Sequence, residues 1–238
     1  MPSLALSGVR GGVGVSSLCA ALAYTLAEQG LRVLVVDLCA HNMQALHMGL
    51  NADEPSGWAQ ASVTGQAWFS ACWQVNGQLS VLPFGQLNDA QHQALKSTLS
   101  AQPECWAKRL EALAEQFDWI LLDTPNSWPR AWLGPHTQWL EVVEADAPCH
   151  VLLARQPRQS PVLINRFDAS QRLQRDLALL WQHQYPTRLL GFSIHADAAV
   201  AEALAAYSPL SAWAPESLAL QDIKRLATWC LTGQSMRK

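Results

Sequence analysis

The stretch Gly8-Val9-Arg10-Gly11-Gly12-Val13-Gly14-Val15-Ser16-Ser17 decides how the rest of this 238-residue sequence is interpreted. It lies between an apolar segment at 4–9, which is typical of a buried strand, and a segment at 16–29 with helical periodicity. Glycines let the backbone curl so that successive N–H groups point into one concavity, and the start of a helix adds partial positive charge. The stretch therefore predicts a phosphate-binding loop, with a tight strand-to-helix turn as the alternative.

Outward from this loop, short apolar runs alternate with helical patterns along the chain. Such alternation is typical of a parallel sheet with helices on both faces. The expected strands cover residues 4–9, 32–37, 79–83, 119–123, 150–154, 161–165 and 188–194. The expected helices cover residues 16–29, 102–116, 169–181, 198–205 and 216–231, and the polar segment 88–103 is expected to be a surface connection or a lid. We predict an α/β fold with a doubly wound, mostly parallel sheet, in a single domain over 1–238.

Composition narrows the class of protein. Half of the residues are hydrophobic and 15% are charged, which is typical of a globular chain, and the net charge of −3 gives no reason to expect nucleic-acid binding. No apolar run reaches the roughly 18 residues that span a bilayer, and the first residues lack the basic region of a signal peptide. The six cysteines are scattered without a CxxC pair, which argues against a zinc site or a disulfide framework. We therefore expect a cytoplasmic protein.

Polar residues stand at the carboxyl ends of three of the expected strands. Asp37 and Asp123 each end a strand, and such ends meet at one edge of a parallel sheet. There the two carboxylates, with the hydroxyl of Ser16, can hold Mg²⁺ directly or through water, although each acid alone is commonly just a polar strand end. Asn165 and Arg166 end a later strand, where an amide can bond to an adenine edge or simply form a turn.

The order of these features resembles the MinD/ParA group of P-loop ATPases, and within it the members encoded with bacterial cellulose synthase. The resemblance covers nearly the whole chain, and the Leu-Pro-Phe-Gly-Gln-Leu stretch is specific to that subgroup. The matching stretches are Gly8 to Gly14, Val35-Val36-Asp37 with Cys39 and Asn42, Gly57-Trp58-Ala59, Leu82-Pro83-Phe84-Gly85-Gln86-Leu87, Leu163-Ile164-Asn165, and Thr228-Trp229-Cys230-Leu231.

The resemblance implies a homodimer that forms around two ATP molecules and their Mg²⁺ ions. It implies that ATP is bound by Arg10, Gly11, Gly12, Val13, Gly14, Val15, Ser16, Ser17, Asn165 and Arg166, and that Mg²⁺ is organised by Ser16, Asp37 and Asp123. The implied partners are a small companion protein of the cellulose operon and the membrane cellulose synthase complex. These partners would recruit the cytoplasmic protein to the inner membrane.

The chain departs from the group at three positions. Two lysines flank the glycines in such loops, one reaching across the dimer and the other contacting the β- and γ-phosphates, and here those positions hold Arg10 and Val15. Arg10 keeps the positive charge as a planar fork. Val15 removes a cation from the place where charge develops in the transition state, a loss that costs on the order of 100- to 1000-fold in rate. Cys39 stands where the group often has an acid.

We therefore expect an ATP-stabilised regulatory or scaffold protein of cellulose synthesis and secretion with weak or no hydrolysis, and we assign no catalytic residue. Two alternatives stay open. One is an actively cycling MinD/ParA-type ATPase that positions a cargo and whose turnover a partner stimulates. The other is an interaction module that binds no nucleotide.

Three further features have two interpretations each. The segment 194–197 either contacts a nucleotide base or places Asp197 as a helix cap. The eleven tryptophans are expected to be mostly core, although tryptophan is also enriched at protein interfaces. The helix at 216–231, followed by the short basic tail 235–238, is expected to pack on the domain rather than bind membranes through its apolar stripe of Leu220, Ile223, Leu226, Ala227 and Cys230.

Overall fold

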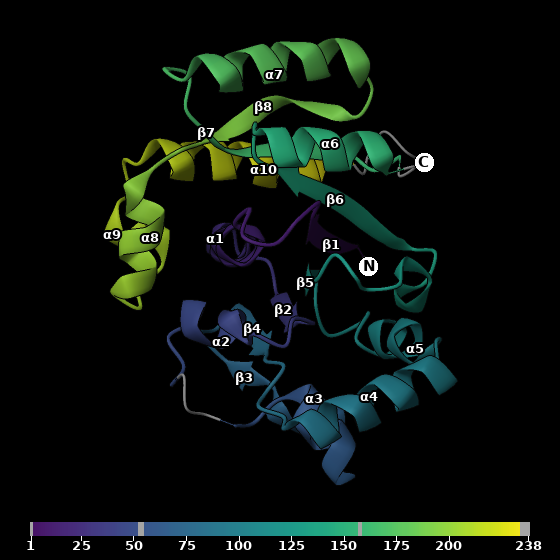
Figure 1. Cartoon of the computed structure of the whole chain (residues 1–238). Coiled ribbons are helices and arrows are strands. Elements are labelled where there is room, and N and C mark those ends of the chain that lie inside the picture. The colour runs from purple at the N-terminus through teal and green to yellow at the C-terminus, as the bar shows by residue number, and fades with distance from the viewer. Residues whose placement is uncertain (1, 52–54, 157–158, 234–238) are drawn as a thin grey trace.

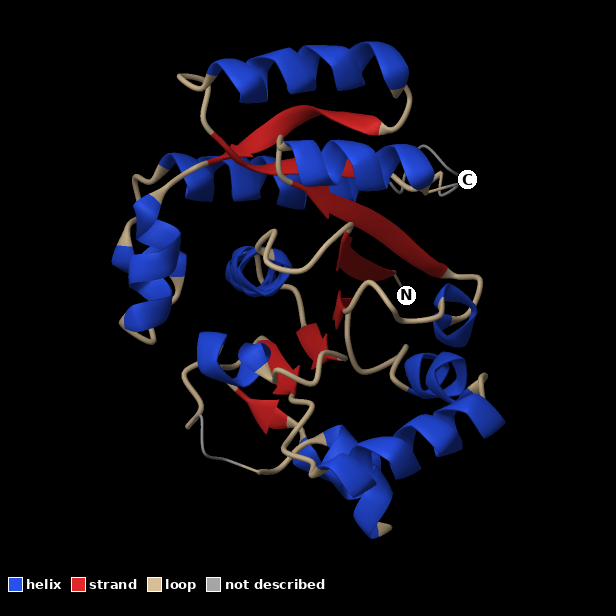
Figure 2. Cartoon of the chain, viewed as in Figure 1, coloured by secondary structure: helices blue, strands red, loops and turns tan. Residues whose placement is uncertain are grey.

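The computed structural model describes residues 2–51, 55–156 and 159–233. An eight-stranded sheet runs in the order β3-β4-β2-β5-β1-β6-β7-β8, and every neighbouring pair is parallel except β3 with β4 (Figures 1 and 2). The strands are β1 (Ser3–Gly8), β2 (Val33–Asp37), β3 (Trp73–Gln74), β4 (Leu79–Leu82), β5 (Trp119–Thr124), β6 (Thr137–Val143), β7 (Val162–Phe167) and β8 (Leu189–His195). The predicted α/β class with a mostly parallel sheet is confirmed.

Helices cover both faces of this sheet, with α7 beside β8 at one end and α3 and α4 at the other (Figure 1). The α-helices are α1 (Val15–Glu28), α2 (Met43–His47), α3 (Trp58–Thr64), α4 (Asp89–Ala101), α5 (Cys105–Ala112), α6 (Ala147–Arg155), α7 (Arg172–Gln184), α8 (Ala198–Ala205), α9 (Leu210–Trp213) and α10 (Leu218–Gly233). Short 3-10 helices lie at Trp68–Ala71 and Arg130–Leu133. No helix within the described residues has the length and apolar character needed to cross a membrane.

Two hydrophobic cores lie on opposite faces of the central strands because side chains alternate along a strand. In β1, Leu4 and Leu6 belong to the larger core beneath α1 and α10, whereas Ala5 belongs to the smaller core beneath α3, α4 and α5. Strands β2 and β5 alternate in the same way. The central strands are therefore buried on both sides, and their carboxyl ends are held at one fixed edge.

The expected strand at 150–154 is wrong, because this segment belongs to α6. Asp146 caps the helix by accepting a hydrogen bond from the backbone N–H of Cys149 at 2.7 Å, and Pro148 takes the second helical position, where no N–H is needed. The strand of this region is β6, whose apolar run is interrupted by the polar Gln138 and the buried Glu141. Those interruptions hid it from the hydrophobic pattern.

The expected surface connection at 88–103 is also wrong, since most of this segment is the helix α4. The alternative of a lid stays a prediction. A capping box starts the helix: Asn88 accepts from the backbone N–H of Gln91, and the Gln91 side chain accepts from the backbone N–H of Asn88, each at 2.9 Å. In α4 only Leu95 and Leu99 are buried. A helix that buries so few apolar residues gives a weak periodic signal.

The C-terminal helix packs on the domain as expected. All five residues of its apolar stripe are buried in the larger core, where α10 lies against α1 and β8. The basic tail 235–238 lies outside the described residues. The stripe is therefore used for folding.

Trp58 links the smaller core to the end of β2. Its ring is fully buried against Trp106 and Phe84, at centroid distances of 4.7 and 5.2 Å, and its Nε1 donates to the carbonyl oxygen of Asp37 at 2.7 Å. Gly57 makes this possible, because a Cβ there would lie 2.1 Å from the backbone nitrogen of Gly85. Two of the stretches that carried the family resemblance thus pack directly on each other.

We expect Trp58→Phe to lower the free energy of unfolding by about 1–3 kcal/mol, because the buried carbonyl of Asp37 loses its donor. Urea denaturation measures this change. The control is Trp73→Phe, since Trp73 is 40% exposed in an edge strand and should change stability by less than about 0.5 kcal/mol. Equal losses in the two variants would contradict the role given to the Trp58 hydrogen bond.

Candidate functional site

The glycine loop connects β1 to α1 with the curl that its sequence predicts. Gly12 and Gly14 each have φ of 83°, in the left-handed region that favours glycine, and a Cβ on Gly14 would lie 2.6 Å from Nδ2 of Asn165. No side chain caps α1, and its first turn holds no acid. In the described part of the chain, the backbone N–H groups of residues 14–17 donate to no acceptor. Free N–H groups at a helix N-terminus suit an anion such as phosphate.

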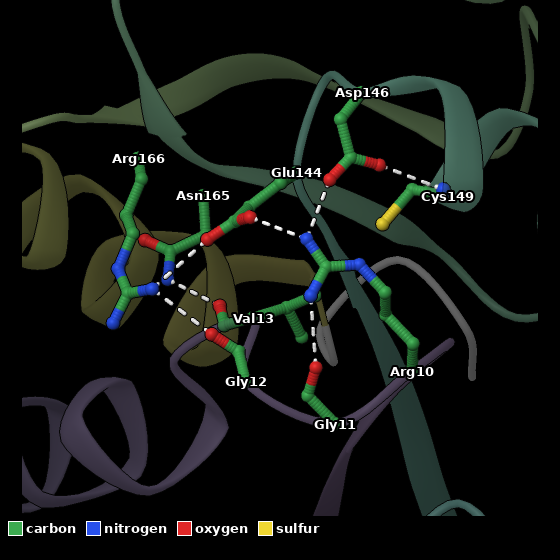
Figure 3. Close-up of polar contacts among 9 residues, drawn as sticks. All are labelled: Arg10, Gly11, Gly12, Val13, Glu144, Asp146, Cys149, Asn165 and Arg166. Atoms are coloured by element: carbon green, nitrogen blue, oxygen red, sulfur yellow. Dashed lines mark hydrogen bonds and ion pairs between the residues drawn. The ribbon is translucent and has the colours of Figure 1, made fainter.

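Three side chains bond to carbonyl groups of the loop, one from the loop itself and two from β7, as Figure 3 shows. The bonds run from Arg10 to the oxygen of Gly11 at 2.9 Å, from Arg166 to the oxygen of Gly12 at 2.9 Å, and from Asn165 to the oxygen of Val13 at 2.8 Å. These bonds keep the carbonyl oxygens occupied and leave the N–H groups as the available polar groups of the loop. Asn165 therefore braces the loop in this structure, and its contact with adenine stays a prediction.

Arg10 forms ion pairs with two carboxylates at the end of β6 (Figure 3). Its Nη2 lies 2.6 Å from Oε2 of Glu144 and 2.5 Å from Oδ2 of Asp146, and Glu144 also pairs with Arg166 at 2.9 Å. The hydrogen bond to Asp146 raises the pKa of Arg10. Partial burial raises the pKa of Asp146, but hydrogen bonds from Cys149 and Arg10 outweigh this effect and lower it overall. The phosphate contact of Arg10 stays a prediction, because its charge is balanced here within its own chain.

Ser16, Asp37 and Asp123 come together at the carboxyl edge of the sheet. Asp37 and Asp123 are register partners on β2 and β5, and both are buried. Ser16 lies in the first turn of α1 beside them, and its side chain lowers the pKa of Asp123. Burial, followed by the charge of Asp123, raises the pKa of Asp37 well above its usual value, although backbone hydrogen bonds from Gln44 and Cys39 oppose the shift. Burial also raises the pKa of Asp123.

This donor set fits Mg²⁺. Two buried carboxylate groups lie side by side, and within the described residues no lysine or arginine forms an ion pair with Asp37 or Asp123. Carboxylate and hydroxyl oxygens are the ligands that Mg²⁺ prefers, and it is bound through one or two carboxylates together with phosphate oxygens. The described residues contain no group of three or more His, Cys, Asp or Glu side chains that could hold a metal ion.

A cavity of about 330 Å³ opens beside the loop. In the cavity wall, the end of β8 contributes His195, whose Nδ1 lies 2.5 Å from Oδ2 of Asp222. Asp197 caps α8 by accepting from the backbone N–H of Ala199 at 3.0 Å, so the capping interpretation is confirmed. The wall also includes Gly14, Ser17, Asn165 and Arg166. A ligand bound at the loop could extend into this cavity.

Val15 and Cys39 stand at two of the positions where the chain departs from the resembled group. Val15 packs on the larger core, and its Cγ2 would lie 3.2 Å from a Cβ placed on Gly8. Burial raises the pKa of the Cys39 thiol, whose Sγ lies 3.2 Å from Nδ1 of His41. Neither side chain brings a fixed charge to the phosphate loop.

Sequence reasoning missed Gln44, Glu144 and Asp146, which contact the predicted site residues. Gln44 lies in α2, which has only five residues, and so short a helix shows no hydrophobic periodicity in the sequence. The two acids follow β6, the strand that the prediction omitted. Had that strand been recognised, acids at its carboxyl end would have pointed to the same edge of the sheet as Asp37 and Asp123.

Solved structures share this fold. The MinD protein of Pyrococcus horikoshii, in complex with Mg-ADP, matches with a TM-score of 0.73 and 20% identity, covering 95% of this chain and 94% of that chain. A ParA family ATPase from Chlorobium tepidum matches with a TM-score of 0.73 and 18% identity, covering 95% and 98%. The fold is that of the MinD/ParA class of P-loop ATPases.

Sequence comparison defines the family within this class. The family model for "Cellulose biosynthesis protein BcsQ" matches residues 1–231. The cellulose biosynthesis protein BcsQ of Escherichia coli (strain K12) is 36% identical over 251 residues, covering 99% of this chain and 96% of that protein. The chain belongs to the BcsQ family of cellulose biosynthesis proteins, which confirms the resemblance inferred from its motifs.

The Arg10–Asp146 ion pair predicts a pH-dependent contribution to stability. A carboxyl group whose pKa is lowered in the folded state stabilises the protein above its unfolded pKa of about 3.9, and the contribution is lost as the pH falls through the folded value. Asparagine is also a good N-cap, so Asp146→Asn removes the charge and keeps the cap. We expect Asp146→Asn to be less stable than the wild type near pH 7 and to approach it below about pH 4.

Urea denaturation at a series of pH values measures this difference. The control is Asp176→Asn, because Asp176 is exposed and its ion pair with Arg172, at 3.5 Å, lies on the surface of α7. A stability difference for Asp146→Asn that is the same at every pH would show that the charge of Asp146 contributes nothing.

Proposed function

We propose that this chain is an ATP- and Mg²⁺-binding protein of bacterial cellulose synthesis and secretion that acts as an ATP-stabilised homodimer. The observation that carries the proposal is the free N–H groups of residues 14–17 beside the buried pair Asp37 and Asp123. The N–H groups favour a phosphate anion, whereas the carboxylates favour a cation. A nucleotide with its Mg²⁺ supplies both.

The loop of this chain is suited to holding ATP more than to hydrolysing it. Backbone N–H groups provide much of the phosphate contact, and they do not depend on the side chain at position 15. Val15 packs inward and supplies no charge to the γ-phosphate region. Cys39 likewise provides no carboxylate to orient a water molecule. ATP that is retained rather than turned over would stabilise a dimer by mass action.

The proposed role is that of a regulatory or scaffold component. The chain would meet a small companion protein of the cellulose operon and the membrane cellulose synthase complex. Contact with these partners, rather than a helix of its own, would bring it to the inner membrane. Membership of the BcsQ family supports this placement in the cellulose system.

A nucleotide-binding experiment tests the proposal. We expect the protein purified without added nucleotide to release ATP or ADP on heating. Once the bound nucleotide has been removed, we expect the mass of the protein in light scattering to double when ATP and Mg²⁺ are added. Gly14→Val should abolish both results, because a side chain on Gly14 meets the amide of Asn165 and requires strained backbone. Gly77→Val is the matched control, since a Cβ on Gly77 meets no atom within 4 Å. Failure of the wild-type chain to bind any nucleotide would favour the interaction-module alternative.

Restoring the lysine tests the slow-hydrolysis part. We expect Val15→Lys to increase ATP turnover by up to about 100-fold, because a cation would again stabilise the transition-state charge. The lysine stem can cover the apolar surface that Val15 covers while its head extends outward. Phosphate release at saturating ATP measures the change. Rapid turnover in the wild type, little altered by Val15→Lys, would instead favour the cycling ATPase.

A further inference from the structure

Gln44 is a long polar side chain buried completely at the edge of the sheet. It lies in α2, directly after β2, and has 0% relative exposure. Glutamine is mostly an exposed residue, and buried polar groups in folded proteins are nearly always hydrogen-bonded. The position of Gln44 therefore calls for a specific set of partners.

Those partners are the three residues predicted to organise Mg²⁺. Nε2 of Gln44 donates to Oδ2 of Asp123 at 2.8 Å and to the backbone oxygen of Ser16 at 3.0 Å. The backbone N–H of Gln44 donates to Oδ2 of Asp37 at 2.9 Å. A single residue thus ties the start of α1, the end of β5 and the end of β2 to one another.

The other end of the amide has no partner. Oε1 of Gln44 is buried and accepts no hydrogen bond from any described residue. The amide orientation is defined, because both groups that contact Nε2 are acceptors and a flipped amide would place oxygen against oxygen. The free atom is therefore an acceptor, and it lies within the same side chain that bonds to Asp123.

We propose that Gln44 is a positioning residue for Mg²⁺ in the nucleotide complex. Through Nε2 it fixes Asp123 and Ser16 in the arrangement that holds the metal. Through Oε1 it accepts a hydrogen bond from a water molecule of the metal's coordination shell, since Mg²⁺ usually keeps several waters. The inference rests on the proposed function, because it requires that the chain bind a nucleotide with Mg²⁺.

Gln44→Met tests the inference, because methionine has nearly the same length and shape but neither donates nor accepts as an amide does. ADP is the nucleotide, and its affinity is measured by calorimetry with Mg²⁺ and again with EDTA. Mn²⁺, followed by its electron paramagnetic resonance signal, reports directly on metal affinity in the ADP complex. We expect metal affinity to fall by about 10- to 100-fold, as when an outer-shell partner of a metal ligand is removed.

The metal-free affinity for ADP separates a positioning role from a structural one. We expect it to stay near the wild-type value in Gln44→Met, and the melting temperature to show that the variant is folded. Gln182→Met, at an exposed position of α7, is the matched control and should change neither affinity. Should Gln44→Met not fold, Gln44→Asn retains an amide in this polar site but is too short to reach all partners, and the same loss of metal affinity is expected.

Two results overturn the inference, and they differ from failure of the proposed function. If the wild type binds ADP with Mg²⁺ but neither Gln44 variant changes the metal affinity, Gln44 does not position the metal. If ADP affinity falls equally with Mg²⁺ and with EDTA, Gln44 acts only on the general structure of the loop. If the wild type binds ADP under neither condition, the proposed nucleotide site itself is wrong.

Discussion

Two carboxylate groups that face each other at the ends of β2 and β5 are the constraint on which the rest of this site depends. Asp37 and Asp123 are buried, and burial together with their mutual charge raises the pKa of Asp37 well above its usual value. A fold gains nothing in stability from such a pair. Groups with such raised pKa values cluster at functional sites, and this pair lies beside the free N–H groups at the start of α1. At this edge of the sheet the N–H groups favour an anion and the carboxylates favour a cation. A phosphate with a bound metal ion would match both preferences.

Residues of the smaller core fix the position of the carboxyl end of β2. Trp58 fixes the carbonyl of Asp37, and Asn42 accepts from the backbone N–H groups of Phe84 and Gly85 at 2.9 and 3.2 Å. The guanidinium of Arg109 lies 4.8 to 5.7 Å from the centroids of three tryptophan rings, including Trp58. Ring faces attract cations, so the three tryptophans stabilise the half-buried charge of Arg109. Precise placement of Asp37 thus depends on packing far from the loop.

An element of this structure can be predicted from the sequence only where its residues form a recognisable local pattern. Short apolar runs predict six of the strands, namely β1, β2, β4, β5, β7 and β8. The loop is recognisable from its glycines, two of which adopt a positive φ that other residues rarely adopt. Asp37 and Asp123 could be placed together because parallel strands share a carboxyl edge. The hydrophobic pattern does not predict an element whose formation depends on tertiary contacts or whose length is little more than one helical turn. Glu141 is buried in β6 beside Arg130, and α2 is too short to show a period.

The partners of Arg10 could not have been found from local patterns, and they give a physical reason for arginine at this position. One guanidinium spans three acceptors: Nη1 donates to the oxygen of Gly11, while Nη2 contacts both Glu144 and Asp146. A lysine ammonium is a compact point charge without this planar fork, so it could not satisfy the same set in the same geometry. The guanidinium of Arg10 therefore fixes the conformation of the loop and also gives the loop a positive charge. Glu144 also pairs with Arg166, so any movement of Arg10 away from its two acids would break an ion-paired network that includes both arginines.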